Sequence, residues 1–200
     1  VTLDNSNYSL AAAAVTGSEA GKLTGHIDQK ALSASQTATV TKTYNKNNTA
    51  VFDATNITLD TSGIISGDTV SVTGGTGTYD SVNAGDRTVT VTGVTLDNSN
   101  YSLAAAAVTG SEAGKLTGHI NQKALSATQT AAVTKTYDKN DSAAFDNSDL
   151  TVSGVITGDT VSVTGSGTYD SVNAGDRSVT VTGVTLDNSN YSLAAAAVTG

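Results

Sequence analysis

Apolar and polar residues alternate along two stretches of the chain, Thr69–Gly74 and Asp86–Asp97. In the second stretch Val89 and Val91 fall on one face, and the threonines between them fall on the other. A period of two is typical of half-buried β-strands rich in β-branched residues. Clusters of turn-forming residues such as SGD, NAGD and LDNSN bound these stretches. The pattern predicts an all-β chain.

The alanine run in SLAAAAVTG (from Ser102) is the one place where the local pattern favours a helix. The run is short, follows an apolar–polar alternation and ends at Val-Thr-Gly, and an isolated helix of this length is marginal in water. We therefore expect a strand or an extended linker here.

A long internal repeat organises the chain. The phrase VTLDNSNYSLAAAAVTG begins at residue 1 and returns at residues 94 and 184. This spacing is far longer than the coil of a solenoid. It is the size of a small β-domain that folds around its own core. We interpret the chain as a slice of a tandem array cut out of phase with its repeat.

The aromatic residues set the predicted phase of the repeat, because each complete copy holds three tyrosines and one phenylalanine and Tyr8 is left over. We expect Tyr8 to be less buried than Tyr101 and Tyr191, and Val1–Leu10 to lie extended. Short linkers are expected near Gly17–Gly25 and Gly110–Gly118. The predicted domains are a closing strand and linker of a truncated preceding repeat (1–30), a first full repeat with linker (31–123) and a second full repeat (124–200).

Several phrases, taken in order, resemble one family. They are KTYNKNNTA and KTYDKNDSA, then SGDTVSVTG, VTLDNSNYSL and GKLTGHIDQKAL. The chain resembles the YDG/MBG-type repeats of large secreted bacterial adhesins, which are filamentous-haemagglutinin-like and use two-partner secretion. The resemblance implies small β-sandwich or β-grasp-like modules in an elongated array. The family's Tyr-Asp-Gly reads Tyr44-Asn45-Lys46 and Tyr137-Asp138-Lys139 here.

The function that this resemblance implies is structural. The repeats are expected to be stalk or spacer units of an extracellular bacterial adhesin, secreted to the bacterial cell surface, which project a distal binding region. The alternative is that the repeats themselves bind a glycan, a matrix component or like repeats, in cell adhesion or biofilm formation. The expected partners are an unknown host or bacterial surface ligand and neighbouring repeats of the same chain.

Charge and composition narrow the partners and the chemistry. The net charge is −8 and the sequence pI is about 4.4, which argues against nucleic acid and against attraction to anionic membranes. No apolar run approaches the roughly 20 residues of a membrane-spanning helix, so membrane insertion is not expected. The absence of cysteine excludes a disulfide scaffold, a cysteine-type zinc cluster and a cysteine nucleophile.

No residue pattern predicts an enzyme, a catalytic residue or a cofactor. His26 and His119 are equivalent, and nothing in the sequence marks a nucleophile and an acid around either of them. Arg87 and Arg177 are expected to pair with an acid at a turn. The glycines of GGTG (from Gly74) lack the lysine of a phosphate-binding loop, so they are expected to form a hairpin turn.

A calcium site is the alternative to having no metal site. The stretch DKNDSAAFDNSD offers several oxygen ligands at short spacing, as calcium prefers. It lacks the glycine and the distal glutamate of an EF-hand, and the first copy has a single acid there. The candidate ligands are Asp138, Asn140, Asp141, Asp146 and Asp149.

Overall fold

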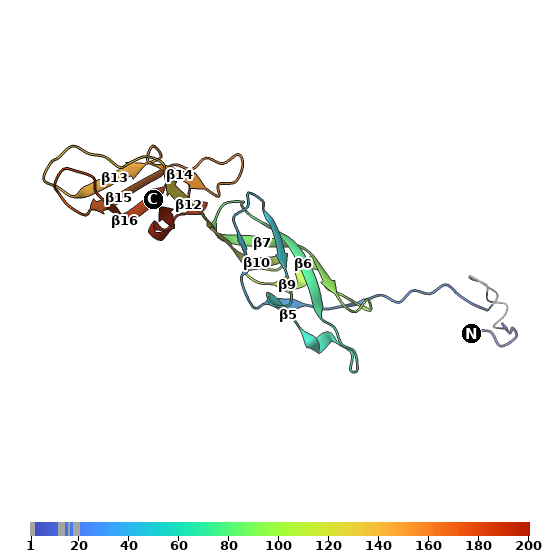
Figure 1. Ribbon diagram of the computed structural model, residues 1–200. Helices are drawn as coiled ribbons and strands as arrows, with labels where there is room; N and C mark the ends of the chain where they lie inside the picture. The colour runs from blue at the N-terminus through green and yellow to red at the C-terminus, as the bar shows by residue number, and fades with distance from the viewer. Residues whose placement is uncertain (1–2, 12–14, 16, 18–20) are drawn as a thin grey trace.

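The computed structural model describes residues 3–11, 15, 17 and 21–200. The described part of the chain contains β-strands and short 3-10 turns and no α-helix. Figure 1 shows two β lobes, from which the segment at the N-terminus extends away. We call the part that spans β1 to β10 the first domain and the part that spans β11 to β18 the second domain.

The elements of the first domain are β1 (Lys30–Ala31), β2 (Ala34–Gln36), β3 (Val40–Thr43), β4 (Thr49–Phe52), β5 (Ile57–Leu59), η2 (Thr61–Gly63), β6 (Val72–Tyr79), β7 (Gly85–Leu96), β8 (Tyr101–Ser102), η3 (Ala105–Ala107), β9 (Val108–Thr109) and β10 (Lys115–Asn121). Those of the second domain are β11 (Lys123–Ala124), β12 (Ser126–Gln129), β13 (Ser142–Asp146), β14 (Leu150–Ser153), β15 (Val163–Tyr169), β16 (Val179–Leu186), β17 (Tyr191–Ser192), η4 (Ala195–Ala197) and β18 (Val198–Thr199).

The first domain is built on a five-stranded sheet in the order β3-β10-β7-β6-β4. A three-stranded sheet, β5-β2-β9, completes it. Strand β7 confirms the strand predicted from the alternation, because Val89 and Val91 are buried while Thr90 and Thr92 are exposed. The all-β prediction is therefore confirmed. The other predicted strand forms only in part, since β6 begins at Val72 rather than Thr69.

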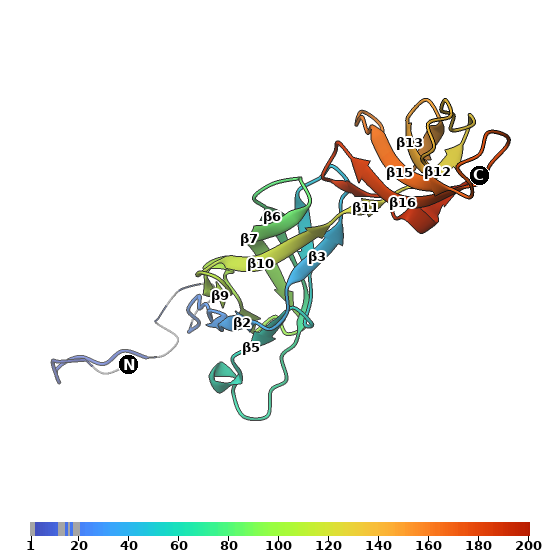
Figure 2. The same cartoon turned by 90° about the vertical axis from the view of Figure 1, so that its left-hand side faces the viewer.

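Strand β10 lies inside this sheet, between β3 and β7 (Figure 2). It runs parallel to β3 and antiparallel to β7. Leu116 and Ile120 point into the core and are 0% exposed. The prediction of a linker near Gly110–Gly118 was therefore wrong, because the second half of that stretch begins a central strand. The apolar residues alternate there, but glycine and threonine between them made the stretch resemble a spacer.

Gly75 occupies the middle of β6 because an aromatic ring takes the space that its side chain would fill. A Cβ at Gly75 would lie 2.1 Å from Cε2 of Phe52, whose strand β4 pairs with β6. Phe52 is buried. The prediction of a hairpin turn at these glycines was wrong, since they lie within a strand where ring and backbone approach closely.

The alanine run adopts neither of the predicted conformations along its whole length. Ala105–Ala107 form the 3-10 turn η3, which joins the two-residue strands β8 and β9. Its counterpart η4 joins β17 and β18 in the second domain. Local alanine propensity thus produces one tight turn, and the flanking residues that pair with β1 and β2 keep it short.

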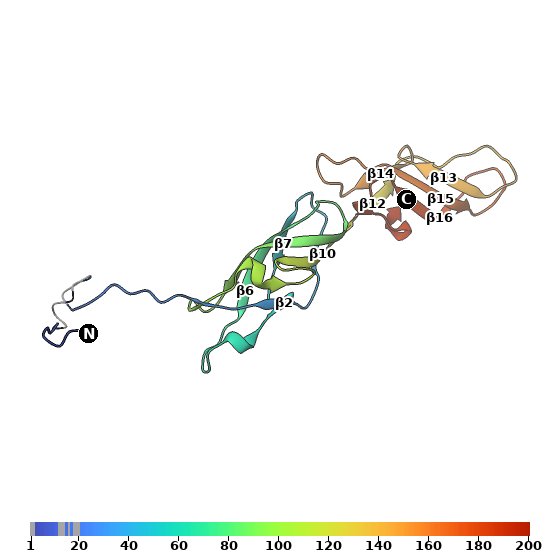
Figure 3. The same cartoon turned by 180° about the vertical axis from the view of Figure 1, so that it is seen from behind.

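The second domain repeats this plan with fewer paired strands. Its sheets have the orders β13-β15-β16 and β14-β12-β18, and Figure 3 shows both from behind. Residues 132–138, which correspond to β3 and its flanks, form no strand. Strand β16 has 8 residues where β7 has 12.

The hydrophobic core does not stop at the boundary between the domains. One cluster contains most of the buried side chains of the first domain together with Leu125 and Tyr191 of the second. A smaller cluster of Ala127, Phe145 and Leu150 with Val163 fills the second domain. The two domains are therefore joined by packed apolar side chains as well as by the chain.

The described residues 3–11 of the N-terminal copy of the repeated phrase are exposed. Tyr8 is 72% exposed, whereas Tyr101 and Tyr191 are 3% and 2% exposed. The expected difference among the three tyrosines is thus confirmed. Residues 3–11 form no strand and turn at residues 6–7, where the Tyr8 N–H donates to the Asn5 carbonyl at 3.3 Å. The prediction of an extended segment is therefore wrong at this turn, and its Val1 and Thr2 part lies outside the described residues.

Candidate interdomain docking site

The densest set of side-chain contacts between the domains centres on the Asp159 carboxylate. It lies in the turn before β15 and is 10% exposed. Tyr191 of its own domain donates its hydroxyl to Oδ2 at 2.7 Å. Tyr44 of the first domain donates to the same oxygen at 2.8 Å. The Lys46 Nζ pairs with Oδ1 at 2.7 Å, so one carboxylate accepts three groups from both domains.

These contacts shift the protonation equilibria of the groups involved. The hydrogen bonds from Lys46, Tyr191 and Tyr44 lower the pKa of Asp159 from its ordinary 3.8 to about 2. Burial, followed by the hydrogen bond to Asp159, raises the pKa of Tyr44 to about 12. The carboxylate therefore stays ionised, and the Tyr44 hydroxyl stays protonated and able to donate, across the neutral range.

Two further contacts surround this centre. The rings of Tyr44 and Tyr191 meet edge to face, with centroids 5.4 Å apart, an arrangement that aromatic pairs favour. On the other side Asn190 accepts from the Ala84 backbone N–H at 2.7 Å and donates to the Asn83 side chain at 3.2 Å. Apolar, aromatic and charged contacts thus all cross the boundary.

Lys46 reaches Asp159 from a strained backbone position. Its φ is +63°, and Lys139 in the second domain has the same value. This left-handed region favours glycine, which the resemblance places at this position of the Tyr-Asp-Gly triplet. The turn therefore keeps the conformation that glycine permits, and in the first domain lysine adds an ammonium that contacts Asp159 and the Gly158 carbonyl.

Replacing each of these lysines with glycine distinguishes the cost of the left-handed backbone from the contribution of the ion pair with Asp159. Lys139→Gly should stabilise the second domain by about 1 kcal/mol, because a left-handed φ costs a non-glycine residue roughly that much. Lys46→Gly relieves the same strain but removes the ion pair with Asp159. We expect thermal denaturation to show a gain for Lys139→Gly, and a smaller gain or a loss for Lys46→Gly. Equal gains would show that the ion pair contributes nothing.

The structure disperses the five candidate calcium ligands among local turns. Asp138 pairs with Lys135 at 2.9 Å. The Asp146 side chain accepts from Ser148, and that of Asp149 accepts from the Asp146 backbone. The Asn140 side chain accepts from the Ser142 backbone, and the Asp141 carbonyl accepts from the Tyr169 N–H. Within the described ranges no three His, Asp or Glu side chains gather as metal ligands would.

His119 and the arginines lie on strand and turn surfaces, whereas His26 lies exposed in a segment without secondary structure, 3.2 Å from Asp28 Oδ1. His119 pairs with Asp86 across β10 and β7, with Nδ1 2.6 Å from Oδ1. Arg87 donates to the carbonyls of its turn rather than to an acid. Arg177 does the same and also lies 4.0 Å from Asp170. The expected pairing of arginine with an acid therefore holds for the second copy only.

Sequence reasoning missed the docking residues because each looks ordinary in isolation. Tyr44 and Tyr191 look like ordinary aromatic residues of a small β-domain, and Asp159 lies in a turn sequence, GD, that suits any loop. The one available signal was the repeated lysine at a glycine position of the triplet. This lysine indicated an unusual backbone conformation but did not indicate which residue it contacts, since Asp159 is more than a hundred residues away in the sequence.

Comparison with known families gives one match, described as the YDG domain, over residues 28–110 and 121–199. Comparisons with curated proteins and with solved structures give no match. No helix in the described part is both long and apolar enough to cross a membrane.

The match corrects two predictions. The matching family is the YDG domain, and the assignment to MBG-type, filamentous-haemagglutinin-like adhesin repeats is not supported by it. The name YDG is also carried by domains that bind DNA and methylcytosine, so the prediction that nucleic acid is not a partner is wrong. That exclusion rested on net charge alone, which describes the whole chain and not a particular surface.

Proposed function

The chain belongs to the YDG domain family, and from that premise we propose that its two domains form a structural spacer whose joint is held at a fixed angle. The observation that carries the proposal is the Asp159 carboxylate, which accepts a tyrosine hydroxyl from each domain and the Lys46 ammonium. A flexible tether needs no such contacts, whereas a spacer that transmits direction needs them.

The path of the backbone supports the same role. Strand β10 ends at Asn121 inside the first domain, and β11 begins at Lys123 and pairs with β17 of the second domain. One residue separates them, so little free chain is left at the joint. Each domain then forms a sandwich-like unit in an elongated array, in which successive units are joined by strand as well as by side chain.

The setting of the spacer is part of the proposal. The expected stalk of an extracellular adhesin at a bacterial cell surface, without enzymatic activity, is compatible with an acidic, cysteine-free β-chain. The rival role, direct ligand binding by the repeats, would require an exposed aromatic patch. Six of the nine aromatic side chains are buried, and this favours the spacer.

Neutralising Asp159 tests the proposal. In Asp159→Asn the carboxamide can no longer pair ionically with Lys46 or accept three charge-assisted hydrogen bonds. We expect NMR relaxation to show one rotational diffusion tensor for both domains of the wild type and two for the variant. Asp68→Asn is the matched control, because Asp68 is the equivalent residue and its carboxylate accepts from Tyr101 within the first domain. A single tensor for Asp159→Asn would contradict the proposal.

Acid should open the same joint. The pKa of Asp159 is about 2 in the folded chain and 3.8 ordinarily, so its stabilising contribution is complete above pH 4 or so and disappears as the pH falls through about 2. Small-angle scattering should show a constant shape from neutral pH to about pH 4, then a broader distribution of interdomain angles below it. Asp159→Asn should have lost this dependence.

A further inference from the structure

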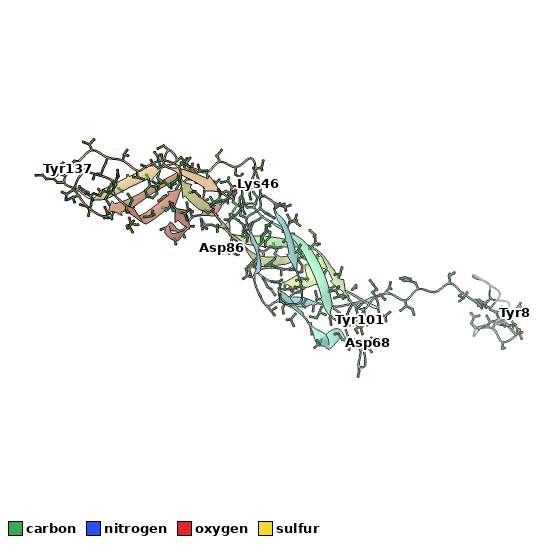
Figure 4. All side chains as sticks on the ribbon, in the orientation of Figure 1. Tyr8, Lys46, Asp68, Asp86, Tyr101 and Tyr137 are labelled. Carbon is green, nitrogen blue, oxygen red and sulfur yellow. The ribbon has the colours of Figure 1, made fainter. Side chains whose placement is uncertain are left out.

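The chain passes from the first domain to the second through a strand that has neighbours on both sides. Strand β10 lies between β3 and β7, parallel to the first and antiparallel to the second. The end of β3, the end of β10 and the start of β7 therefore lie together at one end of the sheet. Tyr44 follows β3 and Ala84 precedes β7, so these two residues flank the connection. Figure 4 shows Lys46, just after Tyr44, and Asp86, just after Ala84, on either side of it.

Each flank carries a contact with the second domain. On the β3 side the Tyr44 hydroxyl donates to the Asp159 carboxylate. On the β7 side the Ala84 N–H donates to Asn190 Oδ1 at 2.7 Å, and Asn190 Nδ2 donates to Asn83 Oδ1 at 3.2 Å. A lean of the second domain toward β7 would open the first contact, and a lean toward β3 would open the second. The two contacts therefore resist opposite movements.

The turn that presents Ala84 is held by its own domain. The Arg87 guanidinium donates to the Asn83 carbonyl from Nε and to the Ala84 carbonyl from Nη2, both at 2.8 Å. Gly85, the next residue, has a φ of +118°, which favours glycine. The Asn83 carbonyl and the Ala84 N–H belong to one planar trans peptide and point in opposite directions. The guanidinium that holds this carbonyl therefore directs the N–H at Asn190.

Asn190 is placed at the connection by the second domain. Its carbonyl accepts from the N–H of Lys123, the first residue of β11, at 2.9 Å. Its N–H donates to Asn188 Oδ1 at 3.1 Å. The backbone is thus fixed within the second domain, and the side chain crosses the boundary. An amide presents an acceptor and a donor side by side, which matches the Ala84 N–H and the Asn83 side-chain oxygen.

We infer that the turn Asn83–Gly85, directed by Arg87, is a second docking point that recognises the Asn190 amide and sets the direction in which the second domain leans. The partner that fits it is a YDG domain with an asparagine immediately before its buried tyrosine, as in Asn190-Tyr191. Arg87 is a positioning residue, because it acts through the peptide that it holds. The inference rests on the proposed spacer role, in which the joint keeps a fixed angle.

Hydrogen exchange at the Ala84 amide measures this contact directly. In Asn190→Ala we expect that amide to exchange roughly three- to tenfold faster than in the wild type, the range that the net worth of one hydrogen bond provides. Arg87→Lys should also accelerate it, because an ammonium lacks the planar fork of a guanidinium. Arg177→Lys, the equivalent change in the second domain, is the matched control and should leave the Ala84 amide unchanged. Equal exchange of this amide in wild type and Asn190→Ala overturns the inference.

Residual dipolar couplings measure the lean itself. We expect Asn190→Ala to keep both domains folded, with a melting temperature close to that of the wild type, and to lean toward the β3 side, where the Asp159 contact remains. Asn100→Ala is the matched control, because Asn100 is the equivalent residue of the first domain and is exposed. It should keep the wild-type orientation. An Asn190→Ala chain with the wild-type orientation, or one that leans toward β7, contradicts the inference.

The wild type distinguishes this inference from the spacer role on which it rests. Two independently tumbling domains in the wild type would overturn both the spacer role and the second docking point. Domains that tumble as one in the wild type, with no change of orientation in Asn190→Ala, would overturn the second docking point alone.

Discussion

Leu116→Ala should lower the free energy of unfolding of the first domain by about 3 kcal/mol or more, since truncating a buried leucine loses its transfer energy and leaves a cavity. Leu116 is 0% exposed in β10. Leu23→Ala, the identical change in the same sequence context, should fall within about 0.5 kcal/mol of wild type, because Leu23 is exposed. Chemical denaturation of dilute protein measures both.

Leu116→Ala and Leu23→Ala differ in where the leucine lies in the fold and not in the sequence around it. Both leucines stand in the sequence GKLTGHI, so local propensity and unfolded-state effects are the same for each. A loss of similar size in the two variants would mean that residues 22–28 are already a core strand in the monomer. No loss in either would mean that β10 contributes nothing to the first domain.

Gly75→Ala should lower the stability of the first domain by about 1–3 kcal/mol, the usual cost of overpacking a core. The new methyl would lie 2.1 Å from Phe52 Cε2, and the phenylalanine ring is buried and cannot move aside without shifting β4. Gly74→Ala is the matched control one residue away. Its Cβ would meet only Thr95 Oγ1, at 3.5 Å, so stability should stay the same or rise slightly.

A second change identifies the cause of that loss. Phe52→Leu alone should destabilise the domain, but Gly75→Ala should cost less in its presence, because the smaller side chain leaves room for the methyl. A double-mutant cycle on unfolding free energies measures this coupling. Additive losses of unfolding free energy would show that the backbone conformation requires glycine at position 75, and that the space taken by the Phe52 ring does not.

The sequence predicts the class of fold and the long strand β7 because alternation of valine and threonine is a local property. It also predicts that Tyr8 differs from Tyr101 and Tyr191, since the count of aromatics per repeat sets the phase. The sequence did not predict strand β10. Its two pairing partners, β3 and β7, lie far from each other in the sequence, so no local pattern shows that a strand fits between them. Glycine and threonine within it removed the usual composition of a strand, although Leu116 and Ile120 keep the spacing.

The docking site was beyond sequence reasoning for a related reason. Its energy comes from groups on two domains, and none of them has an unusual neighbour in the sequence. The left-handed Lys46 is the exception, because a lysine at a glycine position reports a backbone constraint. The hairpin turn predicted at the glycines of β6 is wrong because two different settings favour glycine. A tight turn favours it, and so does the close approach of a ring such as that of Phe52.

Amide hydrogen exchange of dilute protein tests the central claim most directly, that the segment after the repeated phrase at residues 94–110 is a core strand of the first domain. The account predicts that the amides of Leu116 to Ile120 exchange only through global unfolding of the first domain, while those of Leu23 to Ile27 in the same molecule exchange at nearly the rate of an unstructured peptide. Rapid exchange throughout residues 116–120, or equal protection of the two copies, would contradict it.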